Sequence, residues 1–189
     1  MMRSRTELIT QTAAFTAAGL VLSYMETFIV LPVSVPGIRI GLANVSTILA
    51  LYLCGPLSAL TVTLIRVSLA SVLFQTPVSF MYSIAGGLVS LAGMIVCRRT
   101  GFSVYGVSVS GAVLHNFSQV CVAAMLIGNS YIFSIFPVLA GAGVGAGLLT
   151  GLCASVLQKR LEYIFNRSHY KEMDRDNDRI SEGNGSRDI

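Results

Sequence analysis

Long apolar stretches alternate with short breaks along most of the chain. A membrane-spanning helix needs about 20 mostly apolar residues, and Gly, Pro and clusters of polar residues mark the breaks between such helices. On this basis we expect six helical segments, at residues 8–31, 40–53, 57–74, 78–96, 104–127 and 131–157. The second is too short to cross a bilayer alone. It either borrows from residues 37–41 or is partly re-entrant, which requires that its backbone face protein.

Charged side chains are almost confined to the two ends of the chain. Between Leu8 and Gln158 they are limited to Glu26, Arg39, Arg66, Arg98 and Arg99. Over the whole chain 53% of residues are hydrophobic and 12% charged, whereas soluble domains have about 25% charged residues. In water, a protein with so apolar a surface would aggregate. The composition therefore excludes a cytosolic enzyme and predicts an all-α, polytopic membrane protein with six transmembrane helices.

The chain divides by composition into two parts. Residues 1–165 contain all the apolar segments, and we expect them to form a single transmembrane domain. Residues 166–189 are polar and rich in Asp and Arg. Such a segment buries too little apolar surface to offset the entropy lost on ordering. We therefore expect a disordered cytoplasmic tail.

Lys and Arg near the ends of spans concentrate on the cytoplasmic side of a membrane. With six spans and the N-terminus inside, Arg39 is the exception to this rule, and the residues that obey it are Arg3, Arg5, Arg98, Arg99, Lys159 and Arg160. Five or seven spans would place either Arg98 and Arg99 or Lys159 and Arg160 on the outer side. We therefore expect both termini to be cytoplasmic. Because these basic residues mark span ends and form no patch with aromatic residues, we expect no nucleic acid partner.

Ionisable side chains inside spans are costly, so each indicates a function or a pairing. Glu26 lies in the outer half of the first segment, where the negative end of the helix dipole disfavours a carboxylate. Arg66 lies midway along the third. A pair between Glu26 and either Arg66 or Arg39 would relieve both charges. Either the pair fixes the helix register, or these side chains contact a ligand.

The fifth segment carries a second polar group. His115 and Gln119 are four residues apart and share a helix face, with Asn116 beside them. At this depth they need hydrogen-bond partners, which are either other helices or a small molecule in a pocket open to the outer side. The predicted ligand-binding residues are Glu26, Arg39, Asn44, Arg66, His115, Asn116 and Gln119. The excess of arginine over glutamate favours an anionic or zwitterionic ligand.

Known catalytic patterns are not found in the sequence. It contains no Walker A loop, GxSxG elbow or HExxH motif. His115 has no Cys, Asp or second His within the apolar segments to complete a metal site. We therefore expect no catalytic residue, no metal and no cofactor.

Small residues recur at four-residue spacing on two segments, an arrangement that lets helix backbones approach closely in lipid. The sixth segment has Gly143, Gly147 and Gly151. The first has a face made of Ala13, Ala14, Ala17 and Ala18. Each face either packs inside the bundle or docks another protein.

Three stretches carry a resemblance to a known family: PGIRIGLAN at residues 36–44, SIAGGLVSL at 83–91 and GAVLHNFSQ at 111–119. They resemble a bacterial family labelled either Gx transporter or heptaprenyl diphosphate synthase component I, over roughly residues 8–160. That family in turn looks like the substrate-capture S components of energy-coupling-factor (ECF) transporters. The resemblance implies a bacterial cytoplasmic membrane, an S-component-like bundle, and an alanine face that docks a transmembrane coupling subunit working with ATPases.

Two functions follow from the resemblance. The first is a substrate-binding subunit of a small-molecule uptake transporter, embedded in membrane lipid. The alternative is a non-catalytic membrane component of a heptaprenyl diphosphate synthase in isoprenoid quinone synthesis, working with a soluble prenyl synthase subunit. Prenyl elongation ionises an allylic diphosphate held by magnesium, and the enzymes that do this use aspartate-rich motifs. Glu26 is the sole acid between residues 8 and 158, so catalysis would belong to the partner.

Overall fold

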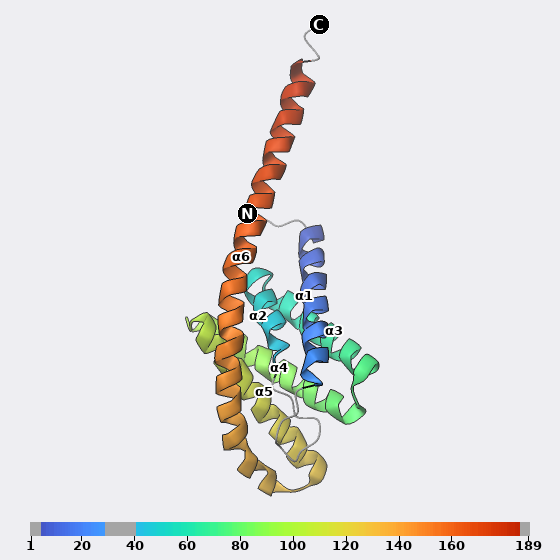
Figure 1. Cartoon of the computed structure of the whole chain (residues 1–189), viewed down its shortest axis with the longest axis vertical. Coiled ribbons are helices and arrows are strands. Elements are labelled where there is room, and N and C mark those ends of the chain that lie inside the picture. Colours follow the sequence, from blue (N-terminus) through green and yellow to red (C-terminus); the bar gives the residue numbers. More distant parts are fainter. Residues whose placement is uncertain (1–4, 29–40, 186–189) are drawn as a thin grey trace. The chain divides into compact units, whose positions relative to one another are not determined.

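The computed structural model describes the backbone of residues 5–28 and 41–185, with side chains as far as Leu161 and at Tyr163. These residues form helices and contain no strand. The helices, labelled in Figure 1, are α1 (Arg5–Glu26), α2 (Asn44–Leu53), α3 (Pro56–Phe74), α4 (Pro77–Arg99), α5 (Val104–Ile127), a 3-10 helix η1 (Ser130–Ile135) and α6 (Phe136–Gly185). The prediction of an all-α fold is confirmed.

Helix ends lie where the sequence places Pro, Gly and hydroxyl residues. Pro56 and Pro77 occupy the first positions of α3 and α4, where a missing N–H is harmless. The Ser103 hydroxyl caps α5 by accepting the Gly106 N–H at 3.3 Å. Gly128 ends α5 with a left-handed φ of 67°, a conformation that favours glycine.

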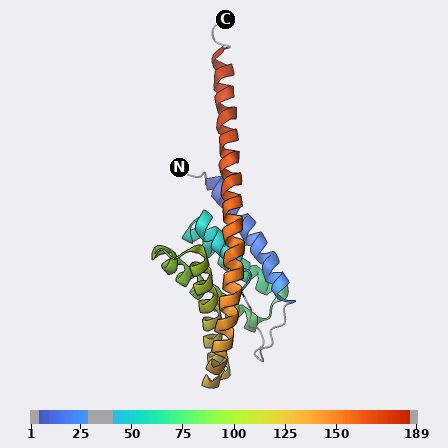
Figure 2. The same ribbon diagram turned by 60° about the vertical axis from the view of Figure 1, so that its left-hand side comes forward.

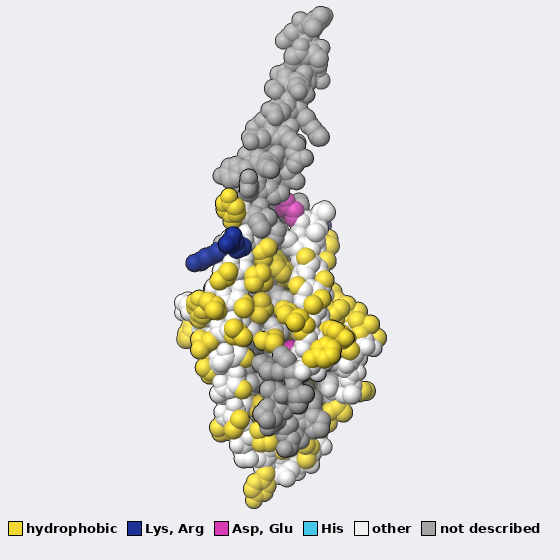
Figure 3. All heavy atoms as spheres, viewed as in Figure 1, with side chains coloured by type: hydrophobic (Ala, Val, Ile, Leu, Met, Phe, Trp, Pro, Cys, Tyr) yellow, Lys and Arg dark blue, Asp and Glu magenta, His cyan; other side chains and the backbone are white. Residues whose placement is uncertain are grey.

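Most of the helices are long and apolar enough to cross a membrane. They are α1, α3, α4, α5 and the stretch 130–161. Large apolar side chains remain exposed on them, such as Leu57, Val72 and Met125 at 78%, 83% and 82%, and hydrophobic side chains cover much of the face seen in Figure 3. Such a surface fits lipid and not water. The prediction of a polytopic membrane bundle is therefore confirmed.

Helix α2 is the short member of the bundle. Its 10 residues extend about 15 Å at 1.5 Å per residue, half the roughly 30 Å of a bilayer core. Residues 46–51 are all buried. Six consecutive residues cover more than one helical turn, so every side of the helix is covered by protein. α2 is therefore an internal helix, and its first residue, Asn44, is buried, which bears on the site below.

The chain forms two compact units, residues 1–155 and 156–189. The first contains α1 to α5, η1 and the beginning of α6. In the second, the helical backbone of α6 continues to Gly185. The domain boundary at residue 165 and the separate cytoplasmic tail stay predictions.

Within the first unit, the glycine face of α6 packs against α5. A Cβ at Gly147 would lie 2.7 Å from Val109 Cα, and one at Gly151 would lie 3.2 Å from Tyr105 Cα. The Ser108 and Thr150 hydroxyls, 2.7 Å apart, share a hydrogen bond across this contact. Figures 1 and 2 show the two helices side by side. The glycines thus serve packing inside the bundle.

Candidate ligand-binding pocket and helix-docking face

A small polar pocket lies among α1 to α5. Its lining residues are Ser23, Glu26, Gly41, Asn44, Arg66, Val67, Gln75, Ser83 and His115. All except Gly41 and Val67 carry polar side chains. The cavity measures about 10 Å³, roughly the space that one water molecule needs. The described residues therefore form a small site lined by charged and polar side chains inside an otherwise apolar bundle.

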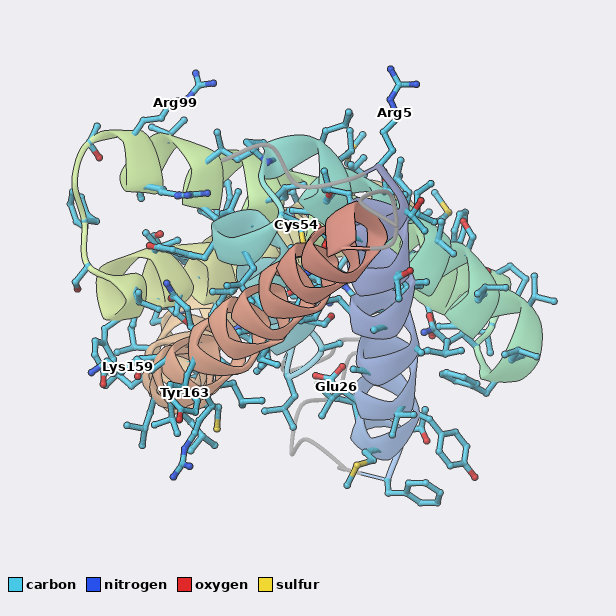
Figure 4. The ribbon with its side chains drawn as sticks, turned by 90° about the horizontal axis from the view of Figure 1, so that it is seen from above. Arg5, Glu26, Cys54, Arg99, Lys159 and Tyr163 are labelled. Carbon is cyan, nitrogen blue, oxygen red and sulfur yellow. The ribbon has the colours of Figure 1, made fainter. Side chains whose placement is uncertain are left out.

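Glu26 connects the end of α1 to the beginning of α2. It is the last residue of α1 and is 7% exposed. Its Oε1 accepts the N–H of Leu42, just before α2. In Figure 4 its side chain points from α1 towards the middle of the bundle, whereas Arg5 and Arg99 point outward. The carboxylate, disfavoured at the end of its own helix, lies at the positive end of the next one.

The turn before α2 depends on Gly41. Its φ of 86° lies in the left-handed region, which other residues adopt only with strain. Its carbonyl accepts the Asn44 N–H at 2.9 Å. A Cβ at Gly41 would lie 3.0 Å from Asn44 Nδ2 and 3.5 Å from His115 Cδ2. A glycine here therefore lets the backbone approach two pocket side chains.

Arg66 extends from α3 towards α1. It is 6% exposed, and its Nη1 donates to Ser23 Oγ at 3.0 Å. Gly19, one turn before Ser23, makes room for it, because a Cβ there would lie 2.7 Å from Arg66 Cδ and would also collide with Ser46 Oγ. The close approach of α1 to α2 and α3 thus fixes the position of the guanidinium. Arg66 lines the same pocket as Glu26, its predicted partner.

His115 and Gln119 interact on one face of α5, as their spacing predicts. Their Nε2 atoms are 3.0 Å apart, and because an amide nitrogen only donates, His115 Nε2 accepts. The His115 ring also contacts α4, where a Cβ at Gly86 would lie 2.6 Å from its Cε1. Gln119 is fully buried and is not among the lining residues. It therefore orients the histidine from behind the pocket.

Asn116 faces a different neighbour. Its Nδ2 donates to the Leu139 carbonyl of α6 at 2.7 Å, and Gly143 leaves the space that the amide occupies. It is 2% exposed and is also absent from the pocket lining. The structure thus places Asn116 at the contact of α5 with α6.

Four predicted ligand-binding residues come together in the pocket: Glu26, Asn44, Arg66 and His115. Arg39 lies outside the described residues. The sequence reasoning missed Ser23, Gln75 and Ser83. Ser23 had a usable signal, since it precedes Glu26 by three residues and shares its helix face. Gln75 and Ser83, which share a hydrogen bond of 3.2 Å, had none.

The other end of α2 is held by Arg98 of α4. Its Nη1 donates to the Leu51 carbonyl, and its guanidinium lies 4.7 Å from the centre of the Tyr52 ring. A cation is favourable at the negative end of a helix. Glu26 and Arg98 thus place charges of the appropriate sign at opposite ends of α2, which fixes Asn44 within the pocket.

The alanine face of α1 lies outside the bundle. Ala13, Ala14, Ala17 and Ala18 are all exposed. Ala13 and Ala17 line a groove of about 580 Å³ between α1 and α3, together with Leu8, Ile9, Thr12, Thr16, Leu20, Leu57, Ser58, Thr61, Ile65 and Leu69. Its threonine hydroxyls bond to carbonyls of their own helices. The face is therefore apolar and open to lipid or to another helix.

No group of three or more His, Cys, Asp or Glu side chains that would hold a metal occurs among the residues that the structure describes. The pocket presents one carboxylate, one guanidinium, one imidazole, and several amides and hydroxyls. Such a set can bind and orient an ionic molecule by charge and hydrogen bonds.

Comparison with known proteins gives one finding that bears on identity. Residues 15–157 match the family model described as "Heptaprenyl diphosphate synthase component I". The match spans α1 from Phe15 to the beginning of the second unit, and so includes every described residue of the pocket. No match was found among curated proteins or among solved structures.

Proposed function

Because the match covers about three quarters of its length, the chain belongs to the heptaprenyl diphosphate synthase component I family, and on this premise we propose that it is a non-catalytic membrane component of such a synthase. The family match is the observation that carries the proposal. The name implies a second component. We infer that this partner is a soluble prenyl synthase subunit, which the chain recruits to the membrane.

The chemistry of the chain supports the division of labour. Chain elongation requires magnesium to hold a diphosphate, and several carboxylates to hold the magnesium. Glu26 is the single acid between residues 8 and 158, and a single carboxylate, which here accepts the Leu42 N–H, is too few to hold magnesium. The elongation step therefore belongs to the partner, and the membrane component holds that partner at the bilayer.

A second candidate function rests on the pocket. Burying Glu26 and Arg66 in an apolar bundle is costly, and simple packing of helices needs neither charge. The exposed alanine face of α1 fits the same reading, since it leaves a close-packing surface free for another membrane subunit. The buried charges and the exposed alanine face together favour a substrate-binding subunit of an uptake transporter, resembling an ECF S component.

Native mass spectrometry separates the two functions. The chain is purified in a mild detergent from membranes of its own cells, without washing at high salt. We expect a stoichiometric complex with a prenyl synthase that contains aspartate-rich motifs. A bound small molecule together with a membrane coupling subunit and ATPases, and no prenyl synthase, would overturn the first candidate and support the second.

A further inference from the structure

Asn44 is a pocket side chain with a buried donor atom to satisfy. It is 4% exposed and lines the cavity. Its Nδ2 has no hydrogen-bond partner among the described residues. A buried donor without an acceptor is unfavourable. An amide nitrogen can only donate, so whatever satisfies it presents an acceptor.

The charges around Asn44 narrow the chemistry of that acceptor. Asn44 is the first residue of α2, and the Arg66 guanidinium lines the same cavity. The guanidinium and the amide donor of Asn44 favour a carboxylate. The Glu26 carboxylate lines the cavity as well and favours a cation beside it. One positive and one negative side chain thus line the same small cavity.

We propose that this pocket binds a small zwitterion of the α-amino acid class. The ligand carboxylate accepts from Asn44 Nδ2 and faces Arg66, and the ligand ammonium donates to Glu26. A carboxylate has about four acceptor sites, so Glu26 can keep the Leu42 N–H while it accepts from the ammonium. The proposal deepens the second candidate function and rests on the pocket being a ligand site.

The size of the cavity limits the ligand and requires that the walls move. A cavity of about 10 Å³ is smaller than any amino acid. Three of its walls are helix ends or turns: Glu26 ends α1, Gly41 precedes α2, and Gln75 follows α3. Such ends separate more easily than packed helix interiors. The walls can therefore part by a small amount, which admits a short side chain and excludes a long one.

Thermal unfolding of the full-length protein in detergent, followed by circular dichroism, tests the proposal. The probes are glycine, L-alanine and L-serine, with acetate and methylammonium as analogues that carry one charge each. Trimethylglycine keeps both charges without an N–H, and so controls for general stabilisation by zwitterions. We expect a saturable rise in Tm with at least one amino acid. Its half-saturating concentration should be about tenfold or more below that of acetate and methylammonium.

Two variants locate the effect at Asn44. Asn44→Ala removes the donor, and we expect it to weaken amino acid binding about tenfold or more. Asn129→Asp is the matched control, because its Oδ1 accepts the Tyr131 N–H at 2.9 Å outside the pocket and an aspartate accepts the same bond. This control should bind as the unsubstituted protein does. If Asn44→Ala does not fold, the comparison of probes on the unsubstituted protein still decides the matter.

The outcomes separate this proposal from the functions on which it rests. The zwitterion proposal is overturned if none of the three amino acids raises the Tm saturably. It is also overturned if trimethylglycine raises the Tm as much as the amino acids do. If native mass spectrometry then finds another molecule bound, the pocket remains a ligand site and the ligand class is wrong. If it finds none and the prenyl synthase complex is present, the second candidate function fails as well.

Discussion

At the scale of single residues, Arg98 shows how a charged side chain is stabilised within the helix bundle. Arg98 is partly buried and both caps α2 and contacts the Tyr52 ring. Truncation in Arg98→Ala leaves the Leu51 carbonyl without this donor and removes the cation–π contact. We expect a loss of about 1–3 kcal/mol, measured as a lower Tm in detergent. The control, Arg99→Ala, alters an exposed neighbour and should leave Tm unchanged. Equal Tm values for the two variants would contradict the capping role.

Gly19 is a second sensitive position, because α1 approaches α2 and α3 there. In Gly19→Ala the added methyl would collide with Ser46 Oγ and lie 2.7 Å from Arg66 Cδ. Overpacking of this kind costs about 1–3 kcal/mol. We therefore expect a lower Tm. Gly145→Ala is the matched control, since a Cβ there meets nothing within 4 Å, and alanine is the better helix former. If both variants unfold alike, the close approach at Gly19 does not hold the bundle together.

At the scale of elements, the small-residue faces of α1 and α6 predict opposite outcomes. Ala14 is exposed, so Ala14→Leu should leave the Tm of the isolated protein unchanged. Gly147 lies against the α5 backbone, so Gly147→Leu should lower it sharply through overpacking. A fall in Tm for Ala14→Leu would mean that the alanine face packs within the bundle. It would remove the main support for a docking role.

The sequence predicted the bounds of the helices better than it predicted which helices pack against each other. Pro, Gly and hydroxyl residues determine helix ends locally, so the bounds of α3, α4 and α5 could be expected within a few residues. Spacing also showed that His115 and Gln119 share a face. It could not show that Asn116 turns to Leu139 of α6. Spacing along one helix defines faces, whereas the neighbour of each face depends on how all the helices pack.

The pocket illustrates the same limit. Buried charge in the sequence pointed to Glu26 and Arg66 because such residues are rare in apolar segments. The bond from the Leu42 N–H to Glu26 was not predictable, since it depends on the position of the Gly41 turn relative to the end of α1. Serine and glutamine are common enough in apolar helices that Gln75 and Ser83 carried no signal.

For the molecule as a whole, orientation in the membrane is a prediction that labelling can test. Six crossings, with α2 and its preceding turn counted as one, place both termini inside. In a variant with Cys54, Cys97, Cys121 and Cys153 replaced by serine, Ser130→Cys should react with an impermeant thiol reagent in intact cells. Phe102→Cys, 58% exposed after α4, should react only after the cells are opened. The reverse labelling pattern would mean that the protein has the opposite orientation in the membrane. Reaction of both in intact cells would make α5 no crossing at all.

Prenyl transfer by the reconstituted protein tests the central claim, a non-catalytic membrane component, most directly. The chain is placed in lipid vesicles with magnesium, an allylic diphosphate and radiolabelled isopentenyl diphosphate, alone or with the prenyl synthase that we expect to co-purify with it. We predict no product from the chain alone, and heptaprenyl diphosphate from the pair at a rate well above that of the soluble subunit alone. Product formed by the chain without a partner, or a soluble subunit that makes the same product equally fast without the chain, would contradict the account.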